Sequence, residues 1–189
     1  MRVATVFGTT LALTAAIGGL ADGGAQAVQL RDGTVYFVQP PDLVEATTTF
    51  KDVNVWGATY YFTINVPQNA GEPLQRVTIT QRSGTGNIRY DLDDTRAFVG
   101  TRSHKGAQLT LGEVIRERET RTVFVNFDPP VTPGQTVTIG LRPVQNPRYS
   151  GVYLFGVTAF PPGEKSHGQF LGFGRFHFYG DGFRRFGFP

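Results

Sequence analysis

The sequence predicts an all-β protein: a two-sheet β-sandwich, immunoglobulin-like in style, of about eight short strands, with one short helix as an option. Three observations support this class. Sixteen Phe and seven Tyr accompany many β-branched residues, which suit a half-buried pleated surface. Twenty-four Gly and 12 Pro mark frequent turns. Between these turns, short runs alternate apolar and polar residues, as strands with one buried face do.

The expected strands follow one another along most of the chain. In order, they cover residues 34–38, 58–66, 74–82, 88–92, 122–127, 136–141, 152–160 and 169–179. Prolines follow the first, second and fifth of these runs and are expected to end them. The run 152–160 is apolar on both faces and predicts a central strand. The residues expected to face the core are Val77, Ile79, Val123, Val125, Phe127, Val137, Ile139 and Leu141.

Two local patterns predict further detail. The Ser-Gly-Thr-Gly-Asn sequence at 83–87 is a turn signal, and it predicts a hairpin between the runs on either side of it. In the segment 109–121, Leu111 and Val114 have helical spacing, and Glu117 stands four residues before Arg121. This spacing predicts one short surface helix, with the two charged residues paired on its face.

The first 27 residues have the layout of a secretory signal peptide. Arg2 supplies a positive start, an apolar run at 11–17 follows, and Ala25-Gln26-Ala27 has the small-x-small cleavage pattern. The apolar run is too short to span a bilayer. We therefore expect export, with the mature chain beginning at Val28 and placed in the periplasm, the cell envelope or outside the cell.

This reading divides the chain into a signal peptide (1–27), a β-sandwich domain (28–179) and a C-terminal tail (180–189) rich in Gly, Phe and Arg. Aromatic and Arg side chains often anchor protein interfaces. The tail is therefore a candidate partner-binding segment. Its candidate residues are Phe183, Arg184, Arg185, Phe186 and Phe188.

Composition excludes several classes of function. The chain contains no Cys, which removes thiol nucleophiles, thiolate metal clusters and redox pairs. Its net charge of +3 is far below that of a dedicated nucleic-acid binder. No apolar run after the signal segment is long enough for a transmembrane helix. No cofactor-binding motif is present, and we expect no cofactor.

Catalytic and metal-binding patterns are weak. His104, His167 and His177 lie far apart in sequence without local pairing, so solvated loop histidines are expected; a metal site built from them is the alternative. Ser103 and His104 are neighbours, a spacing not expected to bring the imidazole onto the hydroxyl, and no nucleophile-elbow motif occurs. The sequence therefore predicts a protein that is not an enzyme.

Two charged clusters have simple structural interpretations. Asp91, Asp93 and Asp94 lack the spacing of a calcium loop and are expected to form a turn at a strand end, with Arg96 neutralising them. The alternating charges at 116–121 are expected to form a solvated face whose members pair with one another.

Several motifs resemble one family. These are FDPPVTPGQTV at 127–137, Asn146-Pro147, GVYLFGV at 151–157 and LGFGRFHFY at 171–179, together with Phe-Lys-Asp at 50–52. The chain is similar here to the exported cyanobacterial proteins known as domain of unknown function 2808. The resemblance extends over nearly the whole mature chain. It implies an envelope or extracellular location, and it implies no activity and no functional residues.

Together these observations predict an exported, non-enzymatic β-sandwich that serves as an interaction or structural module of the cell envelope or extracellular space. Its expected partner is an envelope component, a glycan or a protein, not nucleic acid. The alternative is a periplasmic protein that binds a metal or small ligand.

Overall fold

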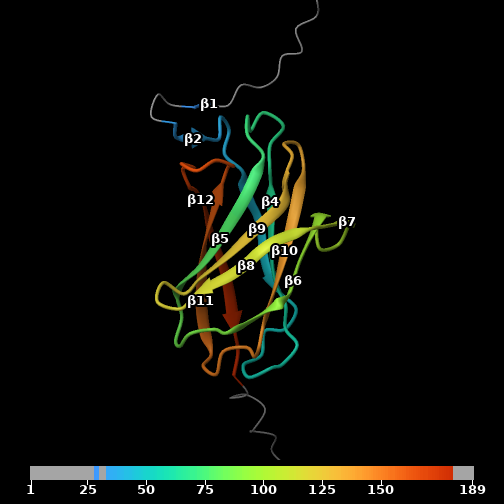
Figure 1. Ribbon diagram of the computed structural model, residues 1–189. Coiled ribbons are helices and arrows are strands. Elements are labelled where there is room, and N and C mark those ends of the chain that lie inside the picture. Colours follow the sequence, from blue (N-terminus) through green and yellow to red (C-terminus); the bar gives the residue numbers. More distant parts are fainter. Residues whose placement is uncertain (1–27, 30–32, 181–189) are drawn as a thin grey trace, which may run out of the picture.

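The computed structural model describes residues 28–29 and 33–180, and all secondary structure in this part of the chain is β. Two five-stranded antiparallel sheets pack face to face (Figure 1). The first contains, in spatial order, β3 (Asp42–Thr48), β4 (Tyr60–Asn65), β10 (Thr136–Pro143), β6 (Tyr90–Gly100) and β7 (Lys105–Leu109). The second contains β12 (Gln169–Phe178), β11 (Gly151–Phe160), β5 (Leu74–Ser83), β9 (Thr122–Val131) and β8 (Leu111–Glu117). A small ribbon pairs β1 (Val28–Gln29) with β2 (Val35–Tyr36).

This arrangement confirms the predicted all-β sandwich, and the residues expected to face the core do so. All eight of them are essentially inaccessible to solvent. The run predicted as a central strand is β11, which lies between β12 and β5. The predicted signal peptide lies outside the described residues.

An aromatic cluster fills the core between the sheets. Tyr60 and Phe62 of β4 meet Phe155 of β11 and Phe176 of β12, with ring centroids 4.9 to 6.0 Å apart. Most of these pairs are tilted or edge-to-face, the arrangements that the ring quadrupoles favour. The four rings come from both sheets, so burying them joins the two layers.

The two sheets also meet along one edge, where β3 contacts β12. Gly174 of β12 permits this approach, because a β-carbon there would lie 2.6 Å from the β-carbon of Ala46 on β3. Phe176 and Phe178 of β12 point into the core, whereas Phe170 and Phe173 pack edge-to-face on its exposed side. β12 thus has one core face and one aromatic outer face.

The predicted hairpin between 74–82 and 88–92 is wrong, because these runs lie in different sheets. β5 pairs with β11 on one edge and β9 on the other, so no edge remains for β6. β6 pairs instead with β10 and β7. The turn signal at 83–87 therefore belongs to a connection that crosses from one sheet to the other.

The helix predicted at 109–121 is also wrong, because this segment forms the end of β7, then β8 and a turn. The register of β8 against β9 shifts between Leu111 and Val114. Such a β-bulge changes the phase of side-chain alternation, so both residues pack on the core although they are three apart. The bulge produces the spacing that a helix would show. The expected pair of Glu117 and Arg121 does not form.

The prolines at 129–130 do not end a strand, contrary to expectation. β9 continues to Val131, which pairs with Leu74. The register of β5 against β9 shifts between Leu74 and Arg76, opposite the proline pair. Proline lacks an N–H to donate, and an irregular stretch is where a sheet tolerates it.

The packing predicts a large difference between two phenylalanines of the second sheet. Phe155→Ala removes a fully buried ring of the aromatic cluster, and we expect it to lower the free energy of unfolding by about 3–5 kcal/mol. Phe173→Ala removes a ring that is 55% exposed and is expected to change it by less than about 0.5 kcal/mol. Urea unfolding followed by circular dichroism measures both. Equal losses of unfolding free energy in the two variants would show that the aromatic cluster does not stabilise the core.

Candidate binding site at one end of the sandwich

Three connections meet at one end of the sandwich, at the bottom of Figure 1. They are the β3–β4 loop (49–59), the β5–β6 loop (84–89) and the β10–β11 loop (144–150), and the segment 179–180 after β12 joins them. We call these four segments the loop end. Backbone hydrogen bonds connect them: Asn54 N donates to Pro147 O at 3.0 Å, and Val53 N to Tyr179 O at 2.9 Å.

Asn146 attaches the β3–β4 loop to the core. Its side-chain oxygen accepts a hydrogen bond from the Tyr60 hydroxyl at 3.0 Å. Its Nδ2 donates to the carbonyls of Phe50 and Asp52 at 3.1 and 2.9 Å, and its backbone N donates to Val55 O at 2.8 Å. The side chain is buried with its polar atoms bonded, which a buried amide requires. The loop is therefore held in one conformation.

The β5–β6 loop is fixed from two sides. The buried Gln81 donates from Nε2 to Gly86 O at 2.8 Å and accepts from Ile88 N at 3.1 Å. On the outer side, the Arg116 guanidinium of β8 donates to the side-chain oxygen of Asn87. These three bonds orient the part of the loop that crosses between the sheets.

Tyr153 of β11 connects two of the loops. Its hydroxyl lies 2.9 Å from Thr85 O and 3.0 Å from Tyr149 O. Its ring packs against Gly84, where a β-carbon would lie 2.1 Å from the ring and where φ is +111°. Only glycine satisfies both conditions. Desolvation by burial raises the pKa of Tyr153, so the phenol stays protonated.

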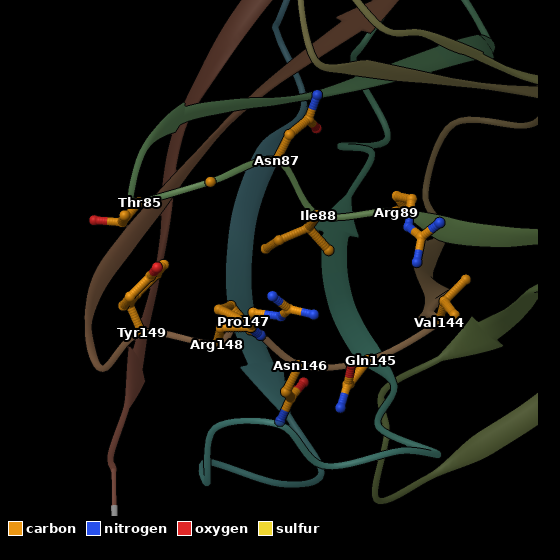
Figure 2. Close-up of a pocket in the computed structure, with 11 residues that line it drawn as sticks. Thr85, Asn87, Ile88, Arg89, Val144, Gln145, Asn146, Pro147, Arg148 and Tyr149 are labelled. Carbon is orange, nitrogen blue, oxygen red and sulfur yellow. The ribbon is translucent and has the colours of Figure 1, made fainter.

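Between the β5–β6 and β10–β11 loops lies a pocket of about 270 Å³, with the buried Ile88 at its centre (Figure 2). Arg89 enters from one loop and Arg148 from the other. Asn87 and Gln145 also line the pocket. The Asn87 amide points away from Ile88 and bonds to Arg116, and Gln145 Nε2 donates to Asn54 O. Because its loops are already bonded to the core, the pocket is formed before any ligand arrives, which lowers the entropic cost of binding.

The loop end carries uncompensated positive charge. Its cations are Lys51, Arg89 and Arg148, and its single carboxylate is Asp52. Arg116 adds a half-buried cation from β8. Burial lowers the pKa of Arg116, and the neighbouring cations Arg118 and Arg89 lower it further, although Tyr90 acts in the opposite sense. Among the described residues none of these cations forms an ion pair.

Four exposed aromatic side chains lie on the loop end, and one of them, Tyr149, lines the pocket. Trp56 is 67% exposed, Tyr149 60%, Tyr179 57% and Phe50 46%. All four lie on the segments of the loop end. Large aromatics at this exposure, gathered on one end of a molecule, mark an interaction surface. With the arginines they provide the residue types that dominate binding energy at interfaces.

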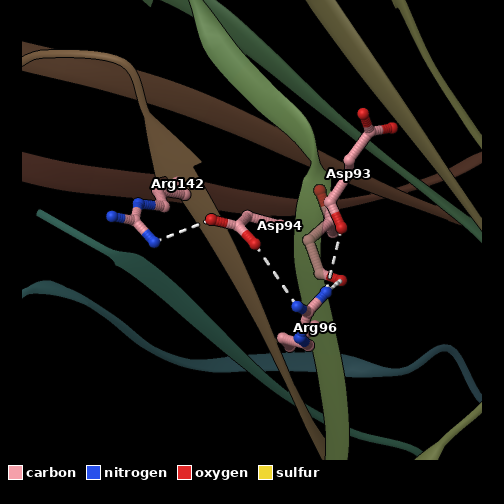
Figure 3. A network of polar contacts seen from close by, with 5 residues as sticks. Asp93, Asp94, Arg96 and Arg142 are labelled. Atoms are coloured by element: carbon pink, nitrogen blue, oxygen red, sulfur yellow. Dashed lines mark hydrogen bonds and ion pairs between the residues drawn. The ribbon is translucent and has the colours of Figure 1, made fainter. Parts of the chain in front are cut away.

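The acidic cluster lies elsewhere, on β6. Asp94 pairs with Arg142 at 2.7 Å and with Arg96 at 3.3 Å (Figure 3), so the expected pairing with Arg96 is confirmed for Asp94 but not for Asp91 or Asp93, whose carboxylates form no ion pair among the described residues. The expected turn at a strand end is wrong, because the cluster lies inside β6. There residues 92–95 bulge opposite the single residue Leu141 of β10. The bulge gives the appearance of a turn without ending the strand.

The three histidines do not come together. His104 lies in the β6–β7 turn, His177 on β12 and His167 in the β11–β12 loop. The His167 ring stacks on Tyr36, with ring centroids 4.6 Å apart. All three are exposed. In the part of the chain that the structure describes, no group of three or more His, Cys, Asp or Glu side chains has a metal-binding arrangement. The metal-binding alternative therefore finds no support in the geometry.

The expectation that Ser103 and His104 cannot bond is wrong. The Ser103 hydroxyl lies 3.1 Å from His104 Nδ1, because a tight turn folds Thr101 and His104 back on each other. The pair is exposed, and within residues 33–180 no carboxylate bonds to the imidazole. A nucleophile needs a base that is itself oriented by a third group. The turn explains this contact without catalysis.

The candidate partner-binding residues of the tail lie outside the described residues. These are Phe183, Arg184, Arg185, Phe186 and Phe188. Instead, the structure identifies residues that the sequence left unremarked: Trp56, Arg89, Arg148 and Tyr149. They lie on three separate loops. The sequence shows that Trp56 is the single Trp and that Arg148 lies between predicted strands, but it does not show that these loops meet.

The fold and the loop end together define a β-sandwich with a preformed surface carried on its loops. The chain belongs to the family described as protein of unknown function (DUF2808), whose model matches residues 34–178. This confirms the resemblance found in the sequence. No curated protein matches the chain. In the described residues no helix is long and apolar enough to cross a membrane.

Solved structures with a similar fold include bacterial surface proteins. The collagen-binding domain of a Staphylococcus aureus adhesin is 11% identical, with a TM-score of 0.37 and coverage of 72% of this chain and 97% of that one. The pilus 2b backbone protein of group B streptococcus is 13% identical, with a TM-score of 0.42 and coverage of 67% and 55%. The C-terminal domain of an antigen I/II-family protein of Streptococcus pyogenes is 15% identical, with a TM-score of 0.42 and coverage of 71% and 46%. The likeness concerns sandwich architecture alone.

The bond between Tyr60 and Asn146 predicts a specific response to alkaline pH. Burial raises the pKa of Tyr60 above that of an unfolded tyrosine, which is about 10. Above that pH only the unfolded state releases this proton, so stability falls by about 1.4 kcal/mol per pH unit. Tyr60→Phe is expected to lower stability by about 1–3 kcal/mol at pH 7, since Asn146 loses its donor. The variant is also expected to show a shallower fall of stability with pH above about 10, by about 1.4 kcal/mol per pH unit, because it lacks this titrating proton.

Urea unfolding between pH 7 and pH 11 measures both effects. Tyr149→Phe is the control, because Tyr149 is exposed and its hydroxyl forms no hydrogen bond with another described residue. An unchanged alkaline slope in Tyr60→Phe would contradict the assignment.

Proposed function

We propose that this protein is an exported, non-enzymatic interaction module of the cell envelope or extracellular space, and that the loop end is its contact surface. The observation that carries the proposal is the gathering of exposed Trp56, Tyr149 and Tyr179 beside a cationic pocket on loops bonded to the core. Leaving these rings in water is unfavourable, and a partner that covers them recovers that free energy.

The rigidity of the loops supports binding rather than conformational gating. Asn146, Gln81 and Tyr153 satisfy the loop carbonyls from the core side. A surface held in this way loses little entropy when a partner binds. The predicted tail begins at Gly180, directly after Tyr179 of the loop end. We propose that its Phe and Arg residues extend the same contact surface.

Export rests on the sequence of residues 1–27 and predicts a defined mature terminus. When the full chain is expressed in a bacterial host with residues 1–27 intact, we expect the protein in the exported fraction. Mass spectrometry of its N-terminal peptide is expected to place the start at Val28. Recovery in the cytosol with the segment still attached would contradict export.

The loop end predicts which residues retain the protein on the envelope. Purified exported protein is sedimented with isolated cell envelope across a salt series. Trp56→Ala with Tyr149→Ala is expected to reduce the bound fraction at least fivefold. The Tyr149 backbone carbonyl that Tyr153 contacts is unaffected by this change. Binding should also weaken with salt, because exposed charges contribute.

The matched control is Phe170→Ala with Phe173→Ala, two exposed aromatics on the outer face of β12. This pair is expected to bind as the unchanged protein does. Deletion of 180–189 tests the tail in the same assay and is expected to reduce retention. If the two double variants lose binding equally, the loop end is not the specific surface.

A further inference from the structure

We infer that the pocket of the loop end binds an acidic polysaccharide, with a carboxylate or sulfate group of the chain between Arg89 and Arg148 and sugar rings against Trp56 and Tyr149. This inference rests on the proposed function and names the ligand class of the same surface. Four features carry it: unpaired charge, a polar wall, adjacent aromatic rings and preformed loops.

The charge of the site calls for an anion. Elsewhere in the described chain the exposed arginines Arg96 and Arg142 share the carboxylate of Asp94. Like the remaining arginines of the described chain, Arg89 and Arg148 form no ion pair, but these two line one pocket together. The planar guanidinium group presents paired N–H donors to an oxyanion, and charge-assisted bonds of this kind are the strong ones.

Arg116 adds to this preference from the side of β8. It is half-buried, and its guanidinium bonds to the neutral side chain of Asn87 rather than to a carboxylate. A partly desolvated cation without a counter-ion is costly. An anion in the adjoining pocket offsets that cost for Arg116 as well as for the two arginines that line the pocket.

The wall of the pocket favours a hydroxyl-rich ligand. The lining includes Thr85, Asn87 and Gln145, whose hydroxyl and amide groups keep donors and acceptors that the bonds to Arg116 and Asn54 do not use. The volume of about 270 Å³ lies below the usual range for drug-sized ligands. It suits a single ring of a chain, whose neighbouring rings then extend along the surface outside the pocket.

The exposed rings lie where those neighbouring sugars would pass. Tyr149 itself lines the pocket. Trp56 is attached close by, because Gln145 Nε2 donates to Asn54 O at 2.9 Å and Asn146 N to Val55 O at 2.8 Å. Flat aromatic faces pack on the C–H faces of sugar rings. A lipid bilayer presents a flat surface, which does not fill a concave polar pocket as a sugar ring does.

The single Trp of the protein provides the assay, because Trp56 lies on the loop end and its fluorescence reports only on this end. The purified protein is titrated with polygalacturonate, which carries carboxylates, and with dextran sulfate, which carries sulfates. Neutral dextran and vesicles of phosphatidylcholine and phosphatidylglycerol serve as comparison ligands. We expect a saturable, salt-sensitive change with at least one acidic polysaccharide, and none with dextran or vesicles.

Charge variants then separate a site from a general attraction. Arg89→Gln with Arg148→Gln is expected to weaken binding at least tenfold. Arg102→Gln with Lys105→Gln removes the same charge from the outer face of the first sheet, where both cations lie over the Tyr61 ring. This control is expected to change affinity by less than twofold. All four side chains are exposed, so both variants are expected to fold, and thermal unfolding checks this.

The outcomes are distinct. Binding of polygalacturonate but not dextran sulfate, or the reverse, supports the inference and identifies the anionic group. Equal losses in the two charge variants would show unspecific attraction and overturn it. Binding to vesicles alone would overturn the ligand class. So would binding to neither polysaccharide. In both cases the proposed function stands if Trp56→Ala with Tyr149→Ala still abolishes envelope retention. If Trp56→Ala with Tyr149→Ala is retained on the envelope as the unchanged protein is, the proposed function itself is overturned.

Discussion

The hydrogen bond from the Tyr60 hydroxyl to Asn146 connects the packed core between the sheets to the loops at one end of the sandwich. On one side, the Tyr60 ring belongs to the aromatic cluster that holds the sheets together. On the other, Asn146 binds the carbonyls of the β3–β4 loop. A buried phenol must find an acceptor, and a buried amide must find partners for all its polar atoms. Each group satisfies the other, so the bonds that complete the core also hold the β3–β4 loop of the loop end.

The fixed loops determine where the positive charge of the chain is placed. A net charge of +3 is small for the whole chain, yet it is not evenly compensated. Asp94 neutralises the arginines beside it on the first sheet. At the loop end, Arg89 and Arg148 face a pocket whose shape is fixed by other contacts. The backbone that carries these arginines is bonded to the core, and this is the physical basis of the proposed recognition surface.

Two wrong expectations show the limits of local pattern. The spacing of Leu111 and Val114 is that of a helix, but a bulge in β8 produces it, and a bulge depends on the register of the neighbouring strand. The turn signal at 83–87 is real, but β5 has neighbours on both edges, so the chain crosses to the other sheet. In both places the deciding contact comes from a strand far away in sequence, which a window of residues cannot contain.

By itself, the sequence determined the fold class, most of the strands and the inward faces of β5, β9 and β10. These follow from alternation, which is a local consequence of strand geometry. It also predicted export and the family. Only the tertiary structure decided which strands pair, and that the loops carrying Trp56, Arg89 and Tyr149 meet at one end. The bonds that join them connect residues as far apart as Phe50 and Asn146, so the proposed binding surface depends on contacts between distant parts of the chain.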